Sequence, residues 1–465
     1  MGAGIVTDTG DTGWVLGSAA LVLFMTPGLA LFYGGLVRSK NVLGTMMQSV
    51  AAIAIVSVVW VLAGYTLAFG PDVGGVIGGL AHLGFRGVGE APHALAPTVP
   101  HSAFASFQMM FAVITPALIA GAFAERVRFG GYVAFIALWS LIVYAPLAHW
   151  VWGGGFLGVD GIGALDFAGG TVVHISAGAA ALAAALYVGK RRGYPRGNFA
   201  PHNVPMVVLG AGILWFGWFG FNAGSALGAN GLASSALLAT HLGAAGAMIG
   251  WLVPERLRHG KATAVGGATG AVAGLVAITP AAGFVGPLPA LAIGLLGGAV
   301  CFAAVEMKSR LGYDDSLDAV GVHMVGGLVG ALLTGVFASL AVNPAGADGG
   351  WAQLGRQGAA AGITLAFSFI ATWAILKLVD RVVGFRMPAK AEESGVDLAE
   401  HGEAAYAFRE HGRHAIPPLE AMSEEELAEM RERLVLEATA RVLQAIGSGI
   451  ARRGSTEEPS ESSGS

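Results

Sequence analysis

The stretch DFAGGTVVHISAG at Asp166–Gly178 places one histidine, His174, inside a run of small and apolar residues. A second run, GVHMVGG at Gly321–Gly327, places His323 in similar surroundings. An imidazole in so apolar a segment either hydrogen-bonds a neighbouring carbonyl in a packed core or belongs to a functional site. Because the two runs resemble each other, we interpret the two histidines as parts of one site.

The composition around these runs is that of a membrane protein. Of the 465 residues, 54% are hydrophobic and only 12% are charged, whereas soluble globular chains carry about 25% charged residues. The 73 glycines suit transmembrane helices that pack closely through small residues. The net charge of −4 identifies no partner, and the single cysteine, Cys301, excludes an intramolecular disulfide.

Apolar segments of about 20 residues are long enough to cross a bilayer as helices. Reading between charged and Gly/Pro-rich interruptions, we predict an all-α polytopic membrane protein with eleven transmembrane helices. The predicted spans are Gly13–Val37, Val42–Phe69, Ser102–Phe123, Gly131–Trp150, Gly170–Val188, Val204–Phe221, Gly231–Val253, Ala264–Thr279, Leu288–Val305, Ala319–Ala341 and Ala359–Leu378.

The basic residues of the connecting loops predict the orientation, because cytoplasmic loops are enriched in Lys and Arg. Along the chain, every second loop is rich in basic residues. The loops between them contain only Arg86 and Arg356. This asymmetry places the N-terminus outside and the C-terminus inside, which requires an odd number of spans. Alternate loops hold Arg38, Lys40, Arg126, Arg128, Lys190, Arg191, Arg192, Arg196, Arg256, Arg258, Lys261, Lys308 and Arg310.

The spans also divide into two halves. Five precede the basic loop 190–196, five follow it, and one is left over, which predicts a five-plus-five inverted repeat plus one extra helix. Inverted repeats place a site near the bilayer midplane. Asp166 lies eight residues before His174, and Asp318 lies five before His323. We therefore predict that the two histidines meet near the repeat axis.

Other polar residues in or near the spans have structural interpretations. His149 and His241 lack such a counterpart, and we predict that they are packing or interface histidines. Asp166 can cap the fifth span, with Gly169 and Gly170 allowing close packing, and we favour this role over direct cation coordination. The chain contains no HExxH, no GxSxG and no Cys/His cluster of zinc spacing. We therefore predict no metal, no cofactor and no enzymatic activity.

Six segments together resemble the motifs of the Amt/Mep/Rh ammonium transporters, and most closely the bacterial Amt branch. The resemblance runs from about Gly13 to Phe408. It implies transport of ammonium, with methylammonium as an analogue, across the cytoplasmic membrane by a homotrimer whose subunits each have a narrow pore. The segments are FQMMFA at 107–112, GAFAERVRF at 121–129, VWGGG at 151–155, DFAGGTVVHISAG at 166–178, WFGFNAGSA at 218–226 and GVHMVGG at 321–327.

The resemblance implies an external cation site formed by Phe111, Trp152 and Ser225, and a stacked pair, Phe111 and Phe221, that closes the pore below it. Aromatic faces attract a cation by roughly 0.5 to 2 kcal/mol. The Ser225 hydroxyl can accept an N–H bond from ammonium. Potassium also feels the aromatic field, but it has no N–H donor to give.

Deeper in the pore, the resemblance implies a pair formed by His174 and His323. It places Trp218 beside the pore, Asp166 near the external site without direct substrate contact, and Asp318 as support for the tenth span. Two imidazoles lying edge to edge can share a proton. We predict that ammonium loses a proton near the phenylalanines and that neutral ammonia crosses the apolar pore. The sequence leaves open whether the proton also crosses.

One residue beside this pair departs from the family. Met324 stands where the family commonly has glycine after the second histidine. One step along a helix turns the side chain by about 100°. Met324 is therefore predicted to point away from His323 and to crowd a neighbouring helix or narrow the inner vestibule.

The sequence divides into a transmembrane domain at 1–380, a cytoplasmic tail motif at 381–411 and an extension at 412–465. GVDLAEHGEAAYAF at 395–408 resembles the family's tail motif, which packs on the inner face and couples subunits. A trimeric PII-type protein can block that face in bacterial relatives, so it is a predicted partner, and a merely structural tail is the alternative. An ammonium sensor that signals through the tail is the alternative function.

The extension is predicted to form one amphipathic helix before a disordered end. Ser423 and Glu426 form a capping box. Apolar residues then recur every four positions, which indicates one apolar helix face that assembles with itself or lies on the membrane. These residues are Met430, Leu434, Ala438, Val442, Ile446 and Ile450.

Overall fold

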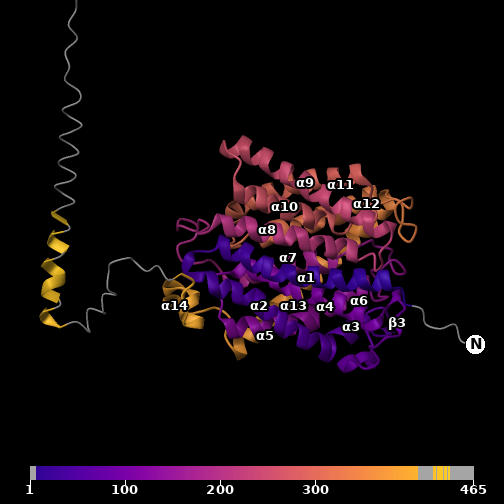
Figure 1. The fold of residues 1–465 in the computed structure, drawn as a ribbon, viewed down its shortest axis with the longest axis horizontal. Helices are drawn as coiled ribbons and strands as arrows, with labels where there is room; N and C mark the ends of the chain where they lie inside the picture. Colours follow the sequence, from indigo (N-terminus) through magenta and orange to yellow (C-terminus); the bar gives the residue numbers. More distant parts are fainter. Residues whose placement is uncertain (1–6, 407–422, 426, 433, 437, 440–465) are drawn as a thin grey trace, which may run out of the picture. The chain divides into compact units, whose positions relative to one another are not determined.

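The computed structural model describes residues 7–406 and 423–439, except 426, 433 and 437. The chain divides into two compact units, Met1–Tyr406 and Ala407–Ser465. In the first unit the helices run side by side as a bundle (Figure 1). The predicted all-α class is confirmed for the described residues, whose strands form only two small hairpins.

Each predicted span coincides with a helix or with a run of helical segments. Ten of these runs are long and apolar enough to cross a membrane, and one further apolar helix, α10, is shorter. The eleven crossings remain a prediction. The helices are α1 (Thr9–Leu36); η1 (Ser39–Asn41), α2 (Val42–Val59), η2 (Trp60–Gly64) and α3 (Tyr65–Phe69); α4 (His101–Phe123); α5 (Phe129–Trp139), η4 (Ser140–Tyr144) and α6 (Ala145–Val151); η5 (Gly170–Ile175) and α7 (Ser176–Val188); α8 (Val204–Trp218) and η6 (Phe219–Ala223); α9 (Gly231–His259); α10 (Ala264–Ile278); α11 (Pro287–Leu311); η7 (Val320–Met324) and α12 (Val325–Phe337); and α13 (Trp351–Val382).

The length of α10 follows from its surroundings. The helix has 15 residues, and all of those from Gly266 to Ile278 are buried. A helix enclosed by protein need not match the thickness of a bilayer, whereas one that faces lipid must. Packing against its neighbours therefore sets the length of α10.

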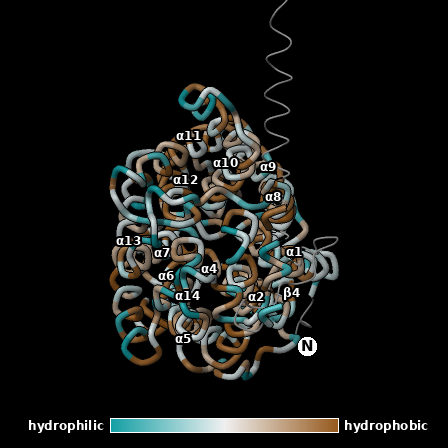
Figure 2. The backbone as a smooth tube through the Cα atoms, turned by 90° about the vertical axis from the view of Figure 1, so that its left-hand side faces the viewer, coloured by the Kyte–Doolittle hydropathy of each residue, from teal (hydrophilic) through white to brown (hydrophobic). Residues whose placement is uncertain are grey.

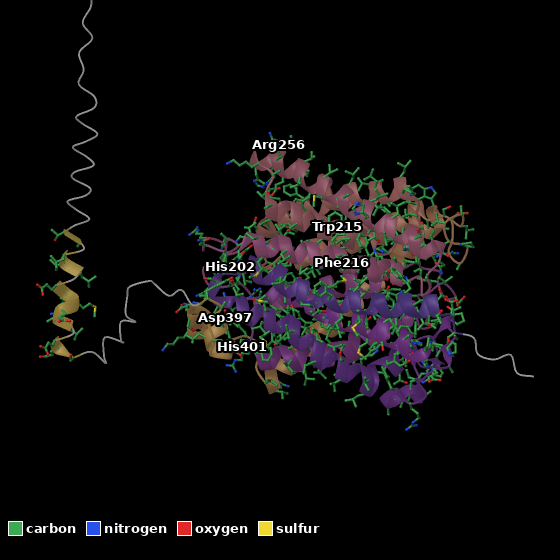
Figure 3. All side chains as sticks on the ribbon, in the orientation of Figure 1. His202, Trp215, Phe216, Arg256, Asp397 and His401 are labelled. Atoms are coloured by element: carbon green, nitrogen blue, oxygen red, sulfur yellow. The ribbon has the colours of Figure 1, made fainter. Side chains whose placement is uncertain are left out.

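The two ends of the bundle differ. Between α3 and α4 lie the hairpins β1 (Asp72–Val73) with β2 (Ile77–Gly78) and β3 (Pro92–His93) with β4 (Ala96–Pro100), together with η3 (Leu80–Phe85). Figure 1 shows β3 at one end of the bundle and α14 (Ala389–Ser394) at the other. In Figure 3, Arg256 and His202 lie at the α14 end. We call these the hairpin end and the basic end.

Much of the outer surface of the bundle is apolar. Hydrophobic segments run around its outside in Figure 2, and Leu209, Phe216 and Ile370 are each more than half exposed. Phe216 lies on α8 (Figure 3). Because these helices are apolar on their outward faces as well as on their buried ones, the unit is built for a lipid environment, as expected of a multi-pass membrane protein.

Spans five and ten approach each other through two glycines placed at the same distance from their histidines. Gly178 stands four residues after His174, and Gly327 four after His323. A Cβ atom added at Gly178 would lie 2.2 Å from the Met324 backbone nitrogen, and one at Gly327 would lie 3.1 Å from the His174 Cβ. This exchange of contacts is what a two-fold relation between the spans predicts; the repeat of the whole halves remains a prediction.

A buried charge network joins the loops at the basic end. Glu125 accepts hydrogen bonds from Arg38, Asn41 and Arg191, and Arg191 also donates to Asp314. Burial favours a higher pKa for Glu125, but the hydrogen bonds and charges of Arg38 and Arg191 outweigh it and hold that pKa below its usual range. The GAFAERVRF motif thus supplies the carboxylate that holds these loops together.

The tail motif packs on this network. The Val396 N–H donates to Asn41 Oδ1 over 2.9 Å, and the Gly44 N–H donates to Asp397 Oδ1 over 2.8 Å. Asp397 begins η8 (Asp397–His401), and Figure 3 shows it beside His401 at the basic end. The compact unit ends at Tyr406, so this segment is part of the bundle rather than a free tail. The predicted domain boundaries themselves remain predictions.

The second unit is described only in part. Its residues 424, 425, 427–432, 434–436, 438 and 439 are helical, and the Leu427 N–H donates to the Ser423 carbonyl. This agrees with a helix that begins at Ser423. The predicted capping partner Glu426 and the later apolar positions Val442, Ile446 and Ile450 lie outside the described residues.

We expect Gly178→Val to destabilise the bundle, because the added side chain would meet the backbone of Met324. Overpacking of this kind costs about 1–3 kcal/mol. The measurement is the thermal midpoint of the detergent-solubilised protein. Gly212→Val is the matched control, since nothing lies within 4 Å of a Cβ added there. Equal midpoints for the two variants would contradict the close packing of spans five and ten.

Candidate functional site

Two cavities lie on either side of the Phe111 and Phe221 rings. We call the first cavity the vestibule; its lining residues include Gln108, Phe111, Trp152, Asp160 and Ser225. The volume in which the centre of a water molecule fits without a clash is about 280 Å³. The second, the lumen, has only about 20 Å³, and its lining residues include Phe221, Trp218, His174 and His323. A site that holds one water needs roughly 10–15 Å³ on this measure. The lumen therefore admits one small molecule at a time.

The vestibule brings together the three residues predicted for the cation site. The Trp152 and Phe111 rings lie 6.0 Å apart and are nearly perpendicular, at 86°. The Trp152 indole is fixed by a 2.9 Å bond from its Nε1 to the Asp166 carbonyl. Ser225 Oγ donates its proton to the Phe221 carbonyl over 2.8 Å. Its oxygen therefore has lone pairs left to accept from a donor in the vestibule.

The predicted aromatic pair separates the cavities. The ring centroids of Phe111 and Phe221 lie 4.2 Å apart at 32°, and both side chains are about 1% exposed. Phe111 lies on α4 and Phe221 on the π-helical segment η6. Extra residues in a π-helical turn redirect the side chains that follow and are frequent at functional sites.

The two histidines lie side by side in the lumen. Their ring centroids are 5.4 Å apart and the ring planes differ by 17°. Each sits in a π-helical segment, His174 in η5 and His323 in η7. Trp218 stacks on His174 at 5.4 Å, and its Nε1 donates to the Thr279 hydroxyl.

The imidazole nitrogens are left with little to bind. Both ring nitrogens of His174, and Nδ1 of His323, are buried without a hydrogen-bond partner. No hydrogen bond joins the two rings among those the structure records, and the sharing of a proton between them remains a prediction. Unsatisfied buried nitrogens cost free energy and indicate a place for a ligand.

Asp166 acts on the backbone rather than on the vestibule. Its carboxylate accepts from the backbone N–H groups of Gly169, Gly170, Thr171 and Val172 over 2.6–3.2 Å. The Thr171 hydroxyl donates to it as well. The side chain therefore caps the start of η5, which is the role that the sequence favoured.

The sequence analysis missed the equivalent cap of the tenth span. Asp315 is fully buried and accepts from the N–H groups of Ala319 and Val320. It stands eight residues before His323, as Asp166 does before His174, and this equal spacing is the signal that could have found it. The counterpart of Asp166 is thus Asp315 rather than Asp318.

Asp318 has a different role. Its carboxylate forms an ion pair with Lys308 of α11, and it lines the lumen. Lys308 also donates to the Asp315 carbonyl over 2.8 Å. Asp318 supports the start of the tenth span, as expected, by tying it to α11 through this lysine.

Two further residues sharpen the picture of the pore. Gln108, in the FQMMFA motif, lines the vestibule with a buried Oε1 that has no partner. It is a possible acceptor for a cation that the sequence analysis did not single out. Met324 faces Gly178 and is absent from the residues that line the lumen. Met324 therefore packs against the fifth span, and both predicted effects of this residue remain predictions.

The bundle and its two cavities define a multi-pass membrane transport protein. The model of the Ammonium Transporter Family matches residues 13–406, and the chain belongs to this family, whose members are transport proteins and not enzymes. The resemblance found in the sequence is thereby confirmed.

Individual relatives agree. An ammonium transporter of Bacillus subtilis is 52% identical over 402 residues, which cover 85% of this chain and 98% of the relative. The crystal structure of Saccharomyces cerevisiae Mep2 matches with a TM-score of 0.80 at 40% identity, over 87% of this chain and 93% of that one. A structure described as a sensor Amt protein matches with a TM-score of 0.77 at 32% identity, over 84% and 98%.

We expect Asp166→Asn to lower the thermal midpoint, because an amide NH₂ would face backbone donors that now share a carboxylate. Hydrogen bonds to charged groups are worth about 1.5–3 kcal/mol each. Asp160→Asn, at an exposed acid of the same cavity, is the control and should leave the midpoint unchanged. An unchanged midpoint for Asp166→Asn, together with weaker ammonium binding, would instead favour direct coordination.

Proposed function

We propose that this chain transports ammonium across the cytoplasmic membrane by binding the cation in the vestibule and conducting ammonia past the histidines. At the phenylalanine pair an N–H bond of ammonium breaks, its electron pair stays on nitrogen, and the proton passes to the imidazole of His174, whose ring lies 6.0 Å from that of Phe221. The observation that carries the proposal is the pair of buried imidazoles with unpartnered nitrogens, in a narrow lumen behind two stacked rings. The hairpin end, which holds the vestibule, faces outward, and the basic end faces the cytoplasm.

Recruitment depends on the vestibule walls. The faces of Trp152 and Phe111 attract a cation by roughly 0.5 to 2 kcal/mol. The Ser225 oxygen accepts an N–H bond, because its own proton is already given to the Phe221 carbonyl. Gln108 Oε1 offers a second acceptor. These acceptors favour ammonium over potassium, which has no proton to donate.

Selection is completed at the ring pair. A cation that enters an apolar passage loses its water, and the carboxylate of Asp318, which lines the lumen, is already paired with Lys308. Ammonia carries no charge and is small enough for the lumen. Inside, the imidazole nitrogens accept or donate hydrogen bonds as ammonia passes. The ring nitrogens thus replace part of the hydrogen bonding that ammonia loses when it leaves water for an otherwise apolar passage.

The assembly that we propose is a homotrimer in the membrane lipid, each subunit with its own pore. The docked tail at the basic end, with Asp397 and Val396 bonded to the start of α2, is the surface for a PII-type regulatory protein. No metal or cofactor takes part in the proposed mechanism.

The second candidate is an ammonium sensor that signals through the cytoplasmic tail. The structural match to a sensor Amt protein favours it. A sensor would bind ammonium without sustained flux, so uptake of methylammonium into proteoliposomes separates the two functions. Uptake in excess of protein-free vesicles supports transport, whereas binding without uptake supports sensing.

We expect Trp152→Leu to raise the concentration of ammonium at half-maximal transport by about fivefold, since loss of a cation–π contact near 1 kcal/mol has this effect. The measurement is transport rate against ammonium concentration. Trp351→Leu is the control, because Trp351 is 89% exposed and lines neither cavity. An unchanged half-saturation would argue against the aromatic site.

Replacing both pore histidines, with His174→Ala and His323→Ala, is expected to reduce the excess of ammonium over potassium transport at least tenfold, because the lumen then lacks imidazole partners. The measurement is solid-supported-membrane current in proteoliposomes, paired with methylammonium uptake. His241→Ala is the control, since His241 is exposed on α9 and lines neither cavity. Ammonium-specific transport that survives in the double variant would refute the role of the pair.

A further inference from the structure

His149 is a buried histidine whose two ring nitrogens both face oxygen acceptors. The side chain is 0% exposed and lies in the last turn of α6. Its Nδ1 lies 2.9 Å from the Ala68 carbonyl oxygen, and its Nε2 lies 2.8 Å from Asp72 Oδ1. A carbonyl oxygen can only accept, so Nδ1 must carry a hydrogen.

The protonation state of Nε2 follows from its partner, Asp72. The Asp72 side chain is 43% exposed, and both of its oxygens also accept from the Gly75 N–H, over 2.9 and 3.0 Å. The hydrogen bonds from His149 and then from Gly75 lower the pKa of Asp72 below its usual value. Asp72 is therefore ionised at neutral pH and can only accept. A ring that donates from both nitrogens is an imidazolium.

The position on the helix favours this charge. The last turn of a helix presents free carbonyl groups and the negative end of its dipole, which stabilises a cation. The carbonyl of His149 itself accepts from Gly153 and Gly155 over 3.0 and 2.9 Å. A Cβ at Gly153 would lie 2.7 Å from His149 Nδ1, so only glycine lets the chain turn so closely around the ring.

The same contacts hold the segment that carries Trp152. Trp150 Nε1 donates to the Val76 carbonyl over 2.6 Å, and the Phe156 N–H donates to the Gly75 carbonyl over 3.0 Å. Together with the Asp72 bond, these tie the β1–β2 hairpin to the chain on both sides of Trp152. The hairpin and the charged pair thus fix the segment of the vestibule wall that carries Trp152.

We propose that His149 is a positively charged positioning residue, and that its ion pair with Asp72 holds Trp152 in place for cation binding in the vestibule. The effect on binding rests on the proposed function, whereas the charge state of His149 does not. Unlike His174, this histidine would be neither a ligand nor a proton acceptor. It would act through the backbone that follows it.

Other titratable groups near α6 do not compete for the ring. The elements that pack against α6 and its hairpin carry Tyr65 on α3, Tyr144 on η4 and His174 on η5, in addition to Asp72. Among the described residues, His149 has a side-chain hydrogen bond only to Asp72 and Ala68. Neutralising Asp72 therefore removes the one negative partner of the ring.

Asp72→Asn tests the charge with little change of shape. The new amide can donate to Nε2, so His149 can lose its proton and keep a hydrogen bond. At pH 8 we expect the half-saturation for methylammonium to rise about threefold or more with an unchanged maximal rate. It should fall back toward the parent value when the external pH is low enough to protonate the ring, because Nε2 then donates to the amide oxygen at position 72 as it does to the carboxylate of the parent. Methylammonium stays protonated throughout, as amines with a pKa near 10 do.

Two controls and one independent measurement make the test decisive. Val73→Ser, at an exposed position of the same strand, should match the parent, and Asp72→Asn with His149→Gln should lose the pH dependence. Nitrogen-15 NMR of labelled histidine, with the His149 signals identified by their loss in His149→Gln, should report two protonated nitrogens in the parent at pH 7.5 and one in Asp72→Asn.

The outcomes are separable. A neutral His149 in the parent overturns the proposal, as does an Asp72→Asn variant with the half-saturation and pH profile of the parent. Reduced folded protein with an unchanged half-saturation would mean a purely structural pair and also overturns it. A parent that shows no methylammonium uptake overturns the proposed function instead, while the NMR result still decides the charge.

Discussion

Two helical runs, η5–α7 and η7–α12, begin inside the protein, and the need to satisfy their first backbone N–H groups is the constraint on which the site depends. An unpaired buried donor costs about 1–3 kcal/mol, and no water is at hand to pair it. Asp166 and Asp315 supply the acceptors. Because each carboxylate precedes its histidine by eight residues, capping also fixes where each imidazole lies. The two glycines that follow then let the helices approach until the rings meet.

The capped helix ends explain how the protein can keep charge away from its lumen. Asp166 is buried, and its carboxylate accepts hydrogen bonds from four backbone N–H groups. Its negative charge is therefore balanced by a helix end and does not bind a passing cation. Asp318, which does line the lumen, is paired with Lys308. Apart from Thr269, what remains beside the histidines is aromatic and aliphatic. A cation is attracted at the mouth by ring faces and carbonyl-type acceptors, and then meets a passage that stabilises only a neutral molecule.

The sequence predicted the helical segments well, because apolar runs bounded by charge are a strong signal and every predicted span is helical over most of its length in the structure. It could not reveal the π-helical turns that hold His174, His323 and Phe221. In a segment that is apolar on all faces, one extra residue per turn leaves no trace in hydrophobic periodicity. The meeting of Phe111 and Phe221 came from family resemblance alone. Asp315 was predictable from its spacing of eight residues before His323, but the sequence analysis paired His323 with the nearer Asp318.

The histidines show why residue type and apolar surroundings do not by themselves decide function. His149 and His174 are both buried in helical spans, and from the sequence His149 was grouped with the packing residues. The difference lies in what faces the nitrogens. His149 meets a carbonyl and a carboxylate, so its donors are spent within the protein. His174 meets neither, and its two nitrogens stay free in a cavity. A buried imidazole whose two nitrogens both face oxygen acceptors is held as a cation that positions the backbone. A buried imidazole without such acceptors can form hydrogen bonds only with the molecules that pass through the pore.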